Sequence, residues 1–339
     1  MLRVGIWGFG GIAAAHRNAY AALEQKGVPA KLTAVCDIRE EAFSKEVKIN
    51  LSAENNSAVS NVYNCYTDIE EMLAEEKLDL IDICLPAYLH AQAVIKVLNK
   101  GYHVLCEKPM ALNYKDCEKM MEAAQKTDKK LMIGQCLHFQ ERYAYLKKAV
   151  ETRKYGNVIS GSFHRLSMAP LWGWENWFMN TAKSGGVKMD LHVHDIDMIQ
   201  YAFGMPKSVS CIVSGKEGLS GIDSVFTAMR YEDGAIIHAA ADWSFPQSFK
   251  FDFGFRISFE KGVLVQDGKG LFFYDDEKCT EIDCPLKASA IANEIEYFIG
   301  TIENHTENTI NPLKCSADTI LLQEYMKESM ENGGKVIEL

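Results

Sequence analysis

The stretch Leu2-Arg3-Val4-Gly5-Ile6-Trp7-Gly8-Phe9-Gly10-Gly11-Ile12-Ala13 decides the fold at the start of the chain. Its apolar first half predicts a buried strand, and the helical pattern behind the glycines predicts a helix that opens in the turn. Gly8 permits the tight turn, while Gly10 lets the backbone approach a pyrophosphate. Because the unpaired N–H groups of a helix N-terminus attract anions, the turn predicts a dinucleotide-binding unit of the Rossmann type.

A carboxylate follows the next predicted strand. Residues 32–36 form an apolar run that leads to Asp37. Asp37 is expected to accept hydrogen bonds from the adenosine ribose and to repel a 2′-phosphate, which favours NAD over NADP. Arg39 follows closely and is able to meet a 2′-phosphate, so NADP stays open as the less favoured cofactor.

Strands and helices alternate through the first part of the chain, which predicts a parallel sheet wound with helices on both faces. We therefore expect an α/β protein whose Rossmann domain occupies residues 1–125. The predicted strands are 2–7, 32–36, 78–85, 103–106 and 130–135, and the predicted helices are 12–25, 69–75, 88–99 and 115–126.

The pattern changes in residues 126–339, where strand-like segments follow one another with tight turns. Glu232-Asp233-Gly234 and Asp267-Gly268 are hairpin signals. This part predicts an α+β domain with a large, mostly antiparallel open sheet that serves substrate binding and self-association. Its predicted strands are 209–213, 224–231, 235–243, 251–259 and 263–266, followed by helices at 288–301 and 316–332, the last of which could pack back on the first domain.

Composition places the chain among soluble globular proteins. Of its 339 residues, 47% are hydrophobic and 24% charged, and the net charge is -10. An acidic surface disfavours nucleic acid and anionic membranes as partners, and no apolar run reaches the roughly 18 to 20 residues that span a bilayer. The start carries no secretory signal, and the 10 cysteines form no CxxC pair. We expect a cytoplasmic protein with reduced, largely buried thiols.

Two further segments carry polar residues suited to chemistry. Glu107-Lys108-Pro109 follows the predicted strand 103–106, and ligands of open α/β sheets bind at the carboxyl ends of strands. Gly185-Gly186 precedes a helical pattern that places Asp190 and His194 at positions i and i+4, hence on one face of a helix.

In these features the chain resembles the Gfo/Idh/MocA oxidoreductases, a family named after glucose–fructose oxidoreductase, inositol dehydrogenase and a rhizopine catabolism protein. The resemblance covers nearly the whole chain. Each motif behind the resemblance is weak evidence by itself, but the motifs together, in this order and spacing, are specific for the family. They are the turn Gly8–Ala13, Val35-Cys36-Asp37, Cys84-Leu85-Pro86-Ala87-Tyr88-Leu89-His90, Glu107-Lys108-Pro109, Ile133-Gly134-Gln135, and Gly185-Gly186 with Asp190 and His194.

The resemblance implies NAD(P)-linked oxidation or reduction of sugars, their derivatives or cyclitols, with Lys108, Asp190 and His194 as the catalytic residues that line the substrate. Leu85-Pro86-Ala87 stands where the family often has Thr-Pro-Asn, and His192 stands where it often has Gly. The cofactor contacts expected for this chain are Gly8, Phe9, Gly10, Gly11, Ile12, Ala13, Asp37, Ile38, Leu85, Pro86, His90, Glu107, Lys108 and Gln135.

The chemistry of that reaction assigns the roles. Oxidation of a CH–OH carbon sends hydride to the nicotinamide and requires a base for the hydroxyl proton. His194 is the natural general base, and Lys108 is expected to stabilise the developing alkoxide. Asp190 would orient His194 or hold a neighbouring substrate hydroxyl. Lys108 remains the alternative proton acceptor.

Residue types in the second half give further candidates. Trp172 belongs to the aromatic run 170–178, whose ring faces either stack on a sugar or pack in a domain core. Arg165, at the end of a predicted strand, is a candidate substrate contact. A metal is not expected where His192 and His194 stand, because residues i and i+2 of a helix point apart.

Two other functions stay open. One is a reductase of non-sugar rings, of the biliverdin reductase and dihydrodiol dehydrogenase type, against which the presence of both Asp190 and His194 argues. The other is a dinucleotide-sensing regulatory protein of the same fold. The exposed antiparallel sheet further predicts a homodimer or homotetramer, and the expected ligand beside the cofactor is a small polyhydroxylated substrate.

Overall fold

The computed structural model describes residues 1–44, 63–286 and 289–339, and the chain divides into two compact units. Unit 1 comprises Met1–Cys136, Trp172–Trp177 and Ala288–Ala317, and unit 2 comprises Leu137–Leu171, Phe178–Lys287 and Asp318–Leu339. Within the described ranges, none of the helices combines the length and the apolar character that a membrane crossing requires.

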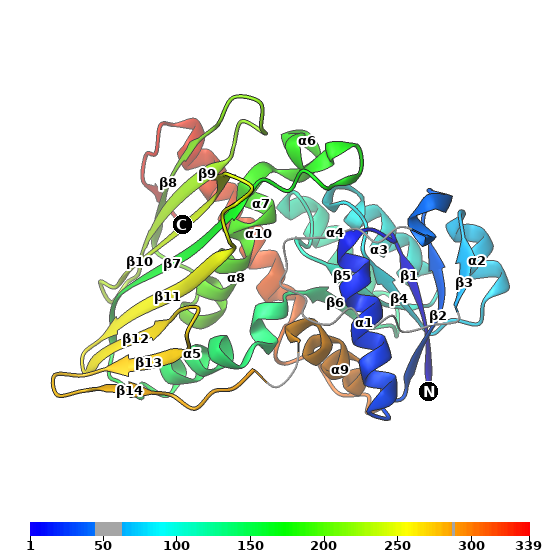
Figure 1. Ribbon diagram of the computed structural model, residues 1–339, viewed down its shortest axis with the longest axis horizontal. Helices are drawn as coiled ribbons and strands as arrows, with labels where there is room; N and C mark the ends of the chain where they lie inside the picture. Colours follow the sequence, from blue (N-terminus) through cyan, green and yellow to red (C-terminus); the bar gives the residue numbers. More distant parts are fainter. Residues whose placement is uncertain (45–62, 287–288) are drawn as a thin grey trace. The chain divides into compact units, whose positions relative to one another are not determined.

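A six-stranded parallel sheet forms the centre of unit 1, in the order β3-β2-β1-β4-β5-β6 (Figure 1). β4 and β6 are buried along their whole length, as strands covered on both faces must be. The parallel pairing confirms the doubly wound sheet predicted from the sequence. The strands are β1 (Leu2–Trp7), β2 (Ala30–Cys36), β3 (Asn64–Tyr66), β4 (Leu80–Ile83), β5 (His103–Glu107) and β6 (Leu131–Gly134).

Helices connect the strands of unit 1. Asp68 starts one of them by accepting a hydrogen bond from the N–H of Glu70, and Asn113 starts another in the same way. Buried free thiols line the sheet, as the sequence predicted, at Cys36, Cys84 and Cys106. The helices are α1 (Gly11–Gln25), α2 (Ile69–Glu75), α3 (His90–Asn99), α4 (Tyr114–Gln125) and α9 (Ala290–Glu303), which packs on α1, with short 3-10 helices η1 (Glu40–Phe43) and η2 (Ala87–Leu89).

A nine-stranded sheet forms unit 2, in the order β14-β13-β12-β11-β7-β10-β9-β8-β15. Its neighbours pair antiparallel except β7 and β10, which confirms the predicted open, mostly antiparallel sheet. The strands are β7 (Val158–Met168), β8 (Ser208–Ser214), β9 (Ser224–Arg230), β10 (Ile236–Phe245), β11 (Asp252–Phe259), β12 (Gly262–Gln266), β13 (Leu271–Tyr274), β14 (Cys279–Glu281) and β15 (Ile337–Glu338).

The strand β7 differs from the sequence expectation. A strand end at Arg165 was wrong, because β7 continues to Met168 and keeps pairing with both of its neighbours. In the register of the sheet, Leu166 pairs with Asp252 on β11 and Met168 with Phe245 on β10. β7 therefore lies inside the sheet and carries Arg165 within it.

Helices cover one face of the nine-stranded sheet (Figure 1). α7 packs on β9 and β10, α8 packs on β7 and β10, and α5 packs on α8. Large side chains fill this core, among them Phe163, Trp243 and Phe255. The helices that pack there are α5 (Glu141–Glu151), α7 (Gly186–Asp190) and α8 (His192–Phe203), and α10 (Leu313–Glu331) adds Leu322 and Met326 to the core. Further helical segments are α6 (Thr181–Ser184), η3 (Cys136–Phe139) and η4 (Trp174–Met179), and η4 begins in unit 1.

Candidate functional site

The glycine turn joins β1 to α1 in the way the sequence predicts. Gly8 has φ +93°, and a Cβ at this position would lie 2.6 Å from the carbonyl oxygen of Cys84, so only glycine fits. Gly10 precedes α1, and a Cβ built on it would meet nothing within 4 Å. α1 begins with no side-chain cap. The open space at Gly10 and the uncapped helix N-terminus together fit a pyrophosphate.

Asp37 ties the end of β2 to this turn. Its Oδ2 accepts a hydrogen bond of 2.8 Å from the N–H of Phe9. Arg39 donates to the same carboxylate from Nε to Oδ1 and from Nη2 to Oδ2, at 2.9 Å each. Both residues are held in place, whereas the side chain of Ile38 is 70% exposed. The acid predicted for the adenosine ribose therefore lies beside the turn predicted for the pyrophosphate.

A tryptophan that the sequence did not single out lies on Arg39. The guanidinium carbon of Arg39 is 5.6 Å from the centre of the Trp174 ring, a cation–π contact within unit 1. Trp172, the predicted substrate contact in the same aromatic run, is half-buried. The clustering of tryptophans was the only sequence signal for Trp174, because its partner is far away in the chain.

The imidazole of His90 contacts two loops at the carboxyl edge of the parallel sheet and links them. Its Nδ1 lies 2.7 Å from the carbonyl oxygen of Pro109, and its Nε2 lies 2.8 Å from that of Leu85. Burial lowers the pKa of His90, while the two carbonyl oxygens and the nearby Glu107 carboxylate oppose that shift. The predicted cofactor residues Leu85 and Pro86 are half-buried in the loop that His90 holds.

Glu107, Lys108 and Gln135 stand at the ends of β5 and β6. Glu107 is buried, and its Oε2 accepts a hydrogen bond of 3.0 Å from the N–H of Lys108. Lys108 is half-buried and precedes a cis peptide bond to Pro109. Gln135 is 1% exposed, and its Nε2 has no hydrogen-bond partner among the described residues. A buried amide without an acceptor fits a polar ligand, such as a carboxamide or a ribose, at this edge.

Unit 2 carries the other predicted catalytic residues. We expected one continuous helix through Asp190 and His194, and this was wrong, because α7 ends at Asp190 and α8 begins at His192. Leu191 joins the two helices with φ -96° and ψ -50°. Along residues 186–200 only Asp190, Leu191 and His194 are half-buried, while the others are buried. Asp190 and His194 are thus the two polar side chains of this stretch that retain access to solvent.

Buried polar pairs anchor α8 next to these residues. Arg165 on β7 donates to Asp195, from Nε to Oδ2 at 3.2 Å and from Nη2 to Oδ1 at 2.8 Å. His192 lies with Nε2 3.0 Å from Oγ1 of Thr227 on β9. Burial, with the nearby charge of Lys188, lowers the pKa of His192 to about 3, so this imidazole is neutral. These anchors fix the backbone on both sides of His194.

Comparison with known proteins identifies the family. Residues 2–135 match the model of the Gfo/Idh/MocA oxidoreductases described as an NAD-binding Rossmann fold, and residues 143–265 match the model of the C-terminal domain of the same family. The chain belongs to the Gfo/Idh/MocA family and is an oxidoreductase with an NAD(P)-binding fold.

Individual relatives are distant. Myo-inositol 2-dehydrogenase from Thermotoga maritima is 27% identical over 340 residues, covering 98% of this chain and 92% of the relative. The 2,7-anhydro-N-acetylneuraminate hydratase of Mediterraneibacter gnavus is 28% identical over 257 residues, covering 71% of this chain but 64% of that enzyme. Among solved structures, levoglucosan dehydrogenase in complex with NADH and levoglucosan superposes with a TM-score of 0.84 at 19% identity, over 100% of this chain and 99% of the other.

Proposed function

We propose that this protein is an NAD-dependent dehydrogenase or reductase that transfers hydride between the nicotinamide and a CH–OH or C=O carbon of a sugar, a sugar derivative or a cyclitol. The observation that carries the proposal is the selective access of Asp190 and His194 in a stretch that is otherwise buried. The names of the relatives support the substrate class, since they act on inositol, an anhydro sugar or an anhydro sugar acid.

NAD is the proposed cofactor. The Asp37 carboxylate lies beside the glycine turn, where it accepts the N–H of Phe9, and we expect its negative charge to favour ribose hydroxyls and to repel a 2′-phosphate. Arg39 is engaged by both oxygens of Asp37, which leaves its guanidinium less available to a phosphate. Gly8 to Ala13, Leu85, Pro86, His90, Glu107 and Gln135 are proposed to surround the rest of the molecule, with Ile38 at the adenosine end.

The protein's own residues are proposed to handle the proton. When bound, NAD accepts the hydride from the substrate carbon. In the oxidation direction the hydroxyl proton passes to Nε2 of His194, whose Nδ1 is buried, or to Nζ of Lys108, while the carbon–oxygen bond becomes a carbonyl. The Lys108 ammonium stabilises the alkoxide as it forms. Asp190 orients His194 or holds a neighbouring hydroxyl.

The remaining predicted substrate contacts are Trp172 and Arg165. Trp172 is half-buried and offers a ring face for stacking on a sugar. Arg165 is 4% exposed and paired with Asp195, so its proposed contribution is to hold α8 beside the substrate. Both stay predictions.

A second candidate reaction is a net hydration or dehydration, because one relative is a hydratase. The two reactions differ in their demand for cofactor. A dehydrogenase reduces one NAD for each substrate oxidised, whereas a hydratase changes many substrate molecules without net change of NAD. The ratio of converted substrate to reduced nicotinamide therefore separates them.

Self-association is proposed through the open face of the nine-stranded sheet. Ile212, Phe226 and Ile236 are exposed on it, and Ile212 pairs with Phe226 across β8 and β9. An exposed apolar sheet face of this kind favours a second copy of the chain as its cover. A homodimer or a homotetramer would result.

The proposed activity is tested with a panel of sugars, sugar acids and cyclitols and their keto forms, each with NAD and NADP. Absorbance of the reduced nicotinamide is measured together with the loss of substrate. If the proposal is correct, at least one polyhydroxylated substrate is converted, and the amount of nicotinamide reduced or oxidised equals the amount of substrate lost. A panel without any turnover would favour the non-catalytic sensing protein.

A further inference from the structure

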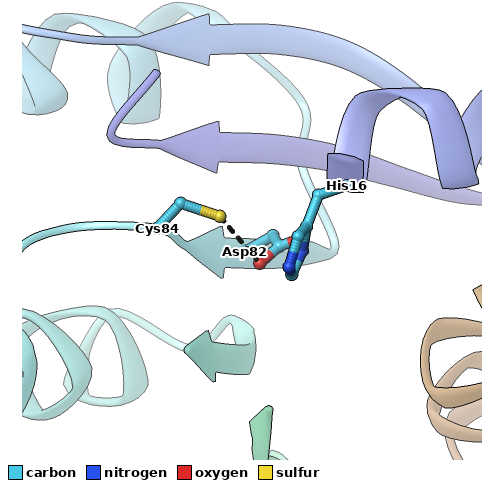
Figure 2. Close-up of side chains that lie close together, drawn as sticks. All are labelled: His16, Asp82 and Cys84. Atoms are coloured by element: carbon cyan, nitrogen blue, oxygen red, sulfur yellow. Dashed lines mark hydrogen bonds and ion pairs between the residues drawn. The ribbon is translucent and has the colours of Figure 1, made fainter. Parts of the chain in front are cut away.

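A buried ionic cluster lies behind the glycine turn and takes no part in the proposed hydride transfer. His16 on α1 is 0% exposed and faces Asp82 on β4, which is also 0% exposed. Figure 2 shows the His16 ring close to the Asp82 carboxylate, with Cys84 on the far side of that carboxylate. Glu107, at the end of β5, lies on the other side of the imidazole. The cluster is formed entirely within unit 1.

His16 has a carboxylate oxygen on each ring nitrogen. Its Nδ1 is 2.7 Å from Oδ2 of Asp82, and its Nε2 is 2.9 Å from Oε1 of Glu107. A neutral imidazole has one N–H group and could donate to only one of these oxygens. An imidazole ring that donates a hydrogen bond from each nitrogen to a carboxylate carries two N–H groups and is therefore an imidazolium. Desolvation opposes this charge, but the neighbouring Asp82 carboxylate outweighs it and raises the pKa of His16 well above 6.5.

Both carboxylates also have further donors. Tyr20 donates from its hydroxyl at 3.0 Å to Oδ2 of Asp82, the same oxygen that faces His16, and the Cys84 thiol lies 3.7 Å from Oδ1. On the other side, Oε2 of Glu107 accepts the N–H of Lys108 at 3.0 Å. The chain of hydrogen bonds therefore begins at Tyr20 and ends at the peptide group of Lys108.

The sheet leaves a place for the Glu107 carboxylate. Gly134 on β6 pairs with Glu107, and a Cβ at Gly134 would lie 3.3 Å from the Glu107 Cα and 3.4 Å from Oε1. A side chain there would press on the carboxylate and displace it from His16. Packing thus restrains Glu107 from the β6 side while His16 restrains it from the α1 side.

A metal ion is the competing explanation of this cluster, since His16, Asp82 and Cys84 present ligand atoms within 4.8 Å of one another. The geometry opposes it: both nitrogens of His16 already face carboxylate oxygens, and as an imidazolium the ring has no lone pair to offer a metal.

We propose that His16 is a positioning residue for Lys108: it fixes the Glu107 carboxylate, and Glu107 in turn fixes the main chain at Lys108. The inference rests on the proposed function only for the catalytic role of Lys108. The proposed effect of His16 on the position of the Lys108 amide depends only on contacts within unit 1 and not on the proposed reaction. Removal of the imidazole leaves Glu107 without its cation and lets the Lys108 peptide group move.

Several titratable groups face this chain of contacts, and they set its pH dependence. They are Asp82 and Cys84 at β4, Cys106 and Glu107 on β5, and Tyr20 on α1. Glu294 on α9 also faces the cluster, because its charge raises the pKa of Tyr20. Burial raises the pKa of the Cys106 and Tyr20 groups, so these stay uncharged at neutral pH. Desolvation opposes ionisation of Glu107, but its hydrogen bond with His16 outweighs this and lowers its pKa. The imidazolium and its two carboxylates are therefore the charges that matter near neutrality.

The test compares His16→Gln with Tyr20→Phe in the full chain. Tyr20→Phe is the matched control, because it removes a hydrogen bond to Asp82 from the same helix and leaves the contact between His16 and Glu107 intact. Four experiments are made on each protein: hydrogen exchange of the Lys108 amide, nitrogen NMR for the protonation state of His16, steady-state kinetics for kcat and KM with NAD and the best substrate of the panel, and urea unfolding for the stability.

In His16→Gln we expect exchange of the Lys108 amide to accelerate about tenfold, as loss of a hydrogen bond to a charged group implies. We expect kcat to fall by about tenfold to a hundredfold with KM for the substrate nearly unchanged, since a small displacement of a catalytic group acts on the chemical step. Tyr20→Phe should change neither. In the unaltered protein His16 should carry protons on both nitrogens at neutral pH.

The proposal is overturned if His16 is neutral at neutral pH, or if the Lys108 amide is equally protected in His16→Gln and the unaltered protein. It is also overturned if both variants lose kcat in proportion to their loss of stability, because that describes a merely structural histidine. The NMR and exchange measurements need no turnover. A protein that turns over no substrate would therefore defeat the proposed function, while NMR and exchange would still decide whether His16 holds the Lys108 amide.

Discussion

Arg39 closes on Asp37 through two side-chain hydrogen bonds, Nε to Oδ1 and Nη2 to Oδ2, each 2.9 Å long. The carboxylate that is proposed to select against a 2′-phosphate therefore also restrains the cation that would attract one. Asp37→Ala removes the ribose acceptor and frees Arg39. We expect NADH binding to weaken by about tenfold or more, as loss of a charged hydrogen-bond partner implies, and NADPH binding to tighten.

Fluorescence titration with NADH and NADPH measures both affinities. Arg39→Ala is the matched control, in which Asp37 is retained and NADH binding should persist while NADPH binding weakens. Tighter binding of NADPH than of NADH by the unaltered protein would refute the proposed cofactor preference.

Substitutions of two glycines in the same turn distinguish an effect on the stability of the fold from an effect on NADH binding. Gly8→Ala forces a Cβ to within 2.6 Å of the Cys84 carbonyl at φ +93°, so we expect a loss of stability of about 1–3 kcal/mol or more. Gly10→Ala meets no protein atom within 4 Å, so its stability should stay within about 1 kcal/mol of the parent while NADH binding weakens, because the methyl group enters the space for the pyrophosphate. Urea unfolding and NADH titration of both variants provide the check. Equal NADH affinity in Gly10→Ala and the parent would speak against a ligand at this turn.

Lys188 gives the protein a stability that rises in alkaline solution. Its ammonium is buried in α7 and donates to the carbonyl oxygen and to Oε1 of Gln323, at 3.1 and 3.2 Å. Desolvation lowers its pKa from 10.5 to about 8 in the folded protein. The unfolded chain therefore binds more protons at this group between these values, so Lys188 adds on the order of 3 kcal/mol to the free energy of unfolding as pH rises across this window, against the opposite contribution of buried thiols such as Cys84.

Lys188→Met should remove this rise, because the group that titrates is gone. The exposed Lys126 serves as the control, since Lys126→Met should leave the slope unchanged. Urea unfolding of the three proteins at pH values from about 8 to about 10.5 gives the slopes. Identical slopes in Lys188→Met and the parent would contradict the assignment of this titration to Lys188.

Phe226 tests the open sheet face. It is 54% exposed on β9 and pairs with Ile212 on β8. If a second copy covers this face, Phe226→Glu buries a charge in the interface and should shift the protein to monomers. Light scattering measures the mass, and Ile38→Glu, at a position 70% exposed in unit 1, should leave the mass unchanged. If light scattering shows that the unaltered protein is a monomer, the proposed self-association through this face is refuted.

Local patterns in the sequence were enough to predict much of the fold. The bounds of β1 and α2 agree with the predicted ranges, because an apolar run and an N-cap at Asp68 are both readable along the chain. The glycine turn and Asp37 were likewise predictable, since their spacing is local to one β-α-β segment. The end of α7 at Asp190 was not, because a helix pattern with period near 3.6 continues through Leu191, whose own dihedral angles stay in the right-handed helical region.

The contacts that the sequence could not predict join residues far apart in the chain. His16 meets Glu107, and Arg39 meets Trp174, only because the sheet order and the later segment of unit 1 bring them together. A histidine in an apolar helix gives no sign of which carboxylates will face it. For the same reason the sequence indicated Arg165 as a possible substrate contact, although its guanidinium is paired with Asp195.

The most direct test of the central claim is the rate of nicotinamide reduction by His194→Ala and Lys108→Ala, with the best polyhydroxylated substrate of the panel, compared with the unaltered protein. The account predicts that both variants still bind NADH but lose turnover by about a hundredfold or more, the usual contribution of a general base or of a stabilising cation. Full turnover in both variants would contradict it.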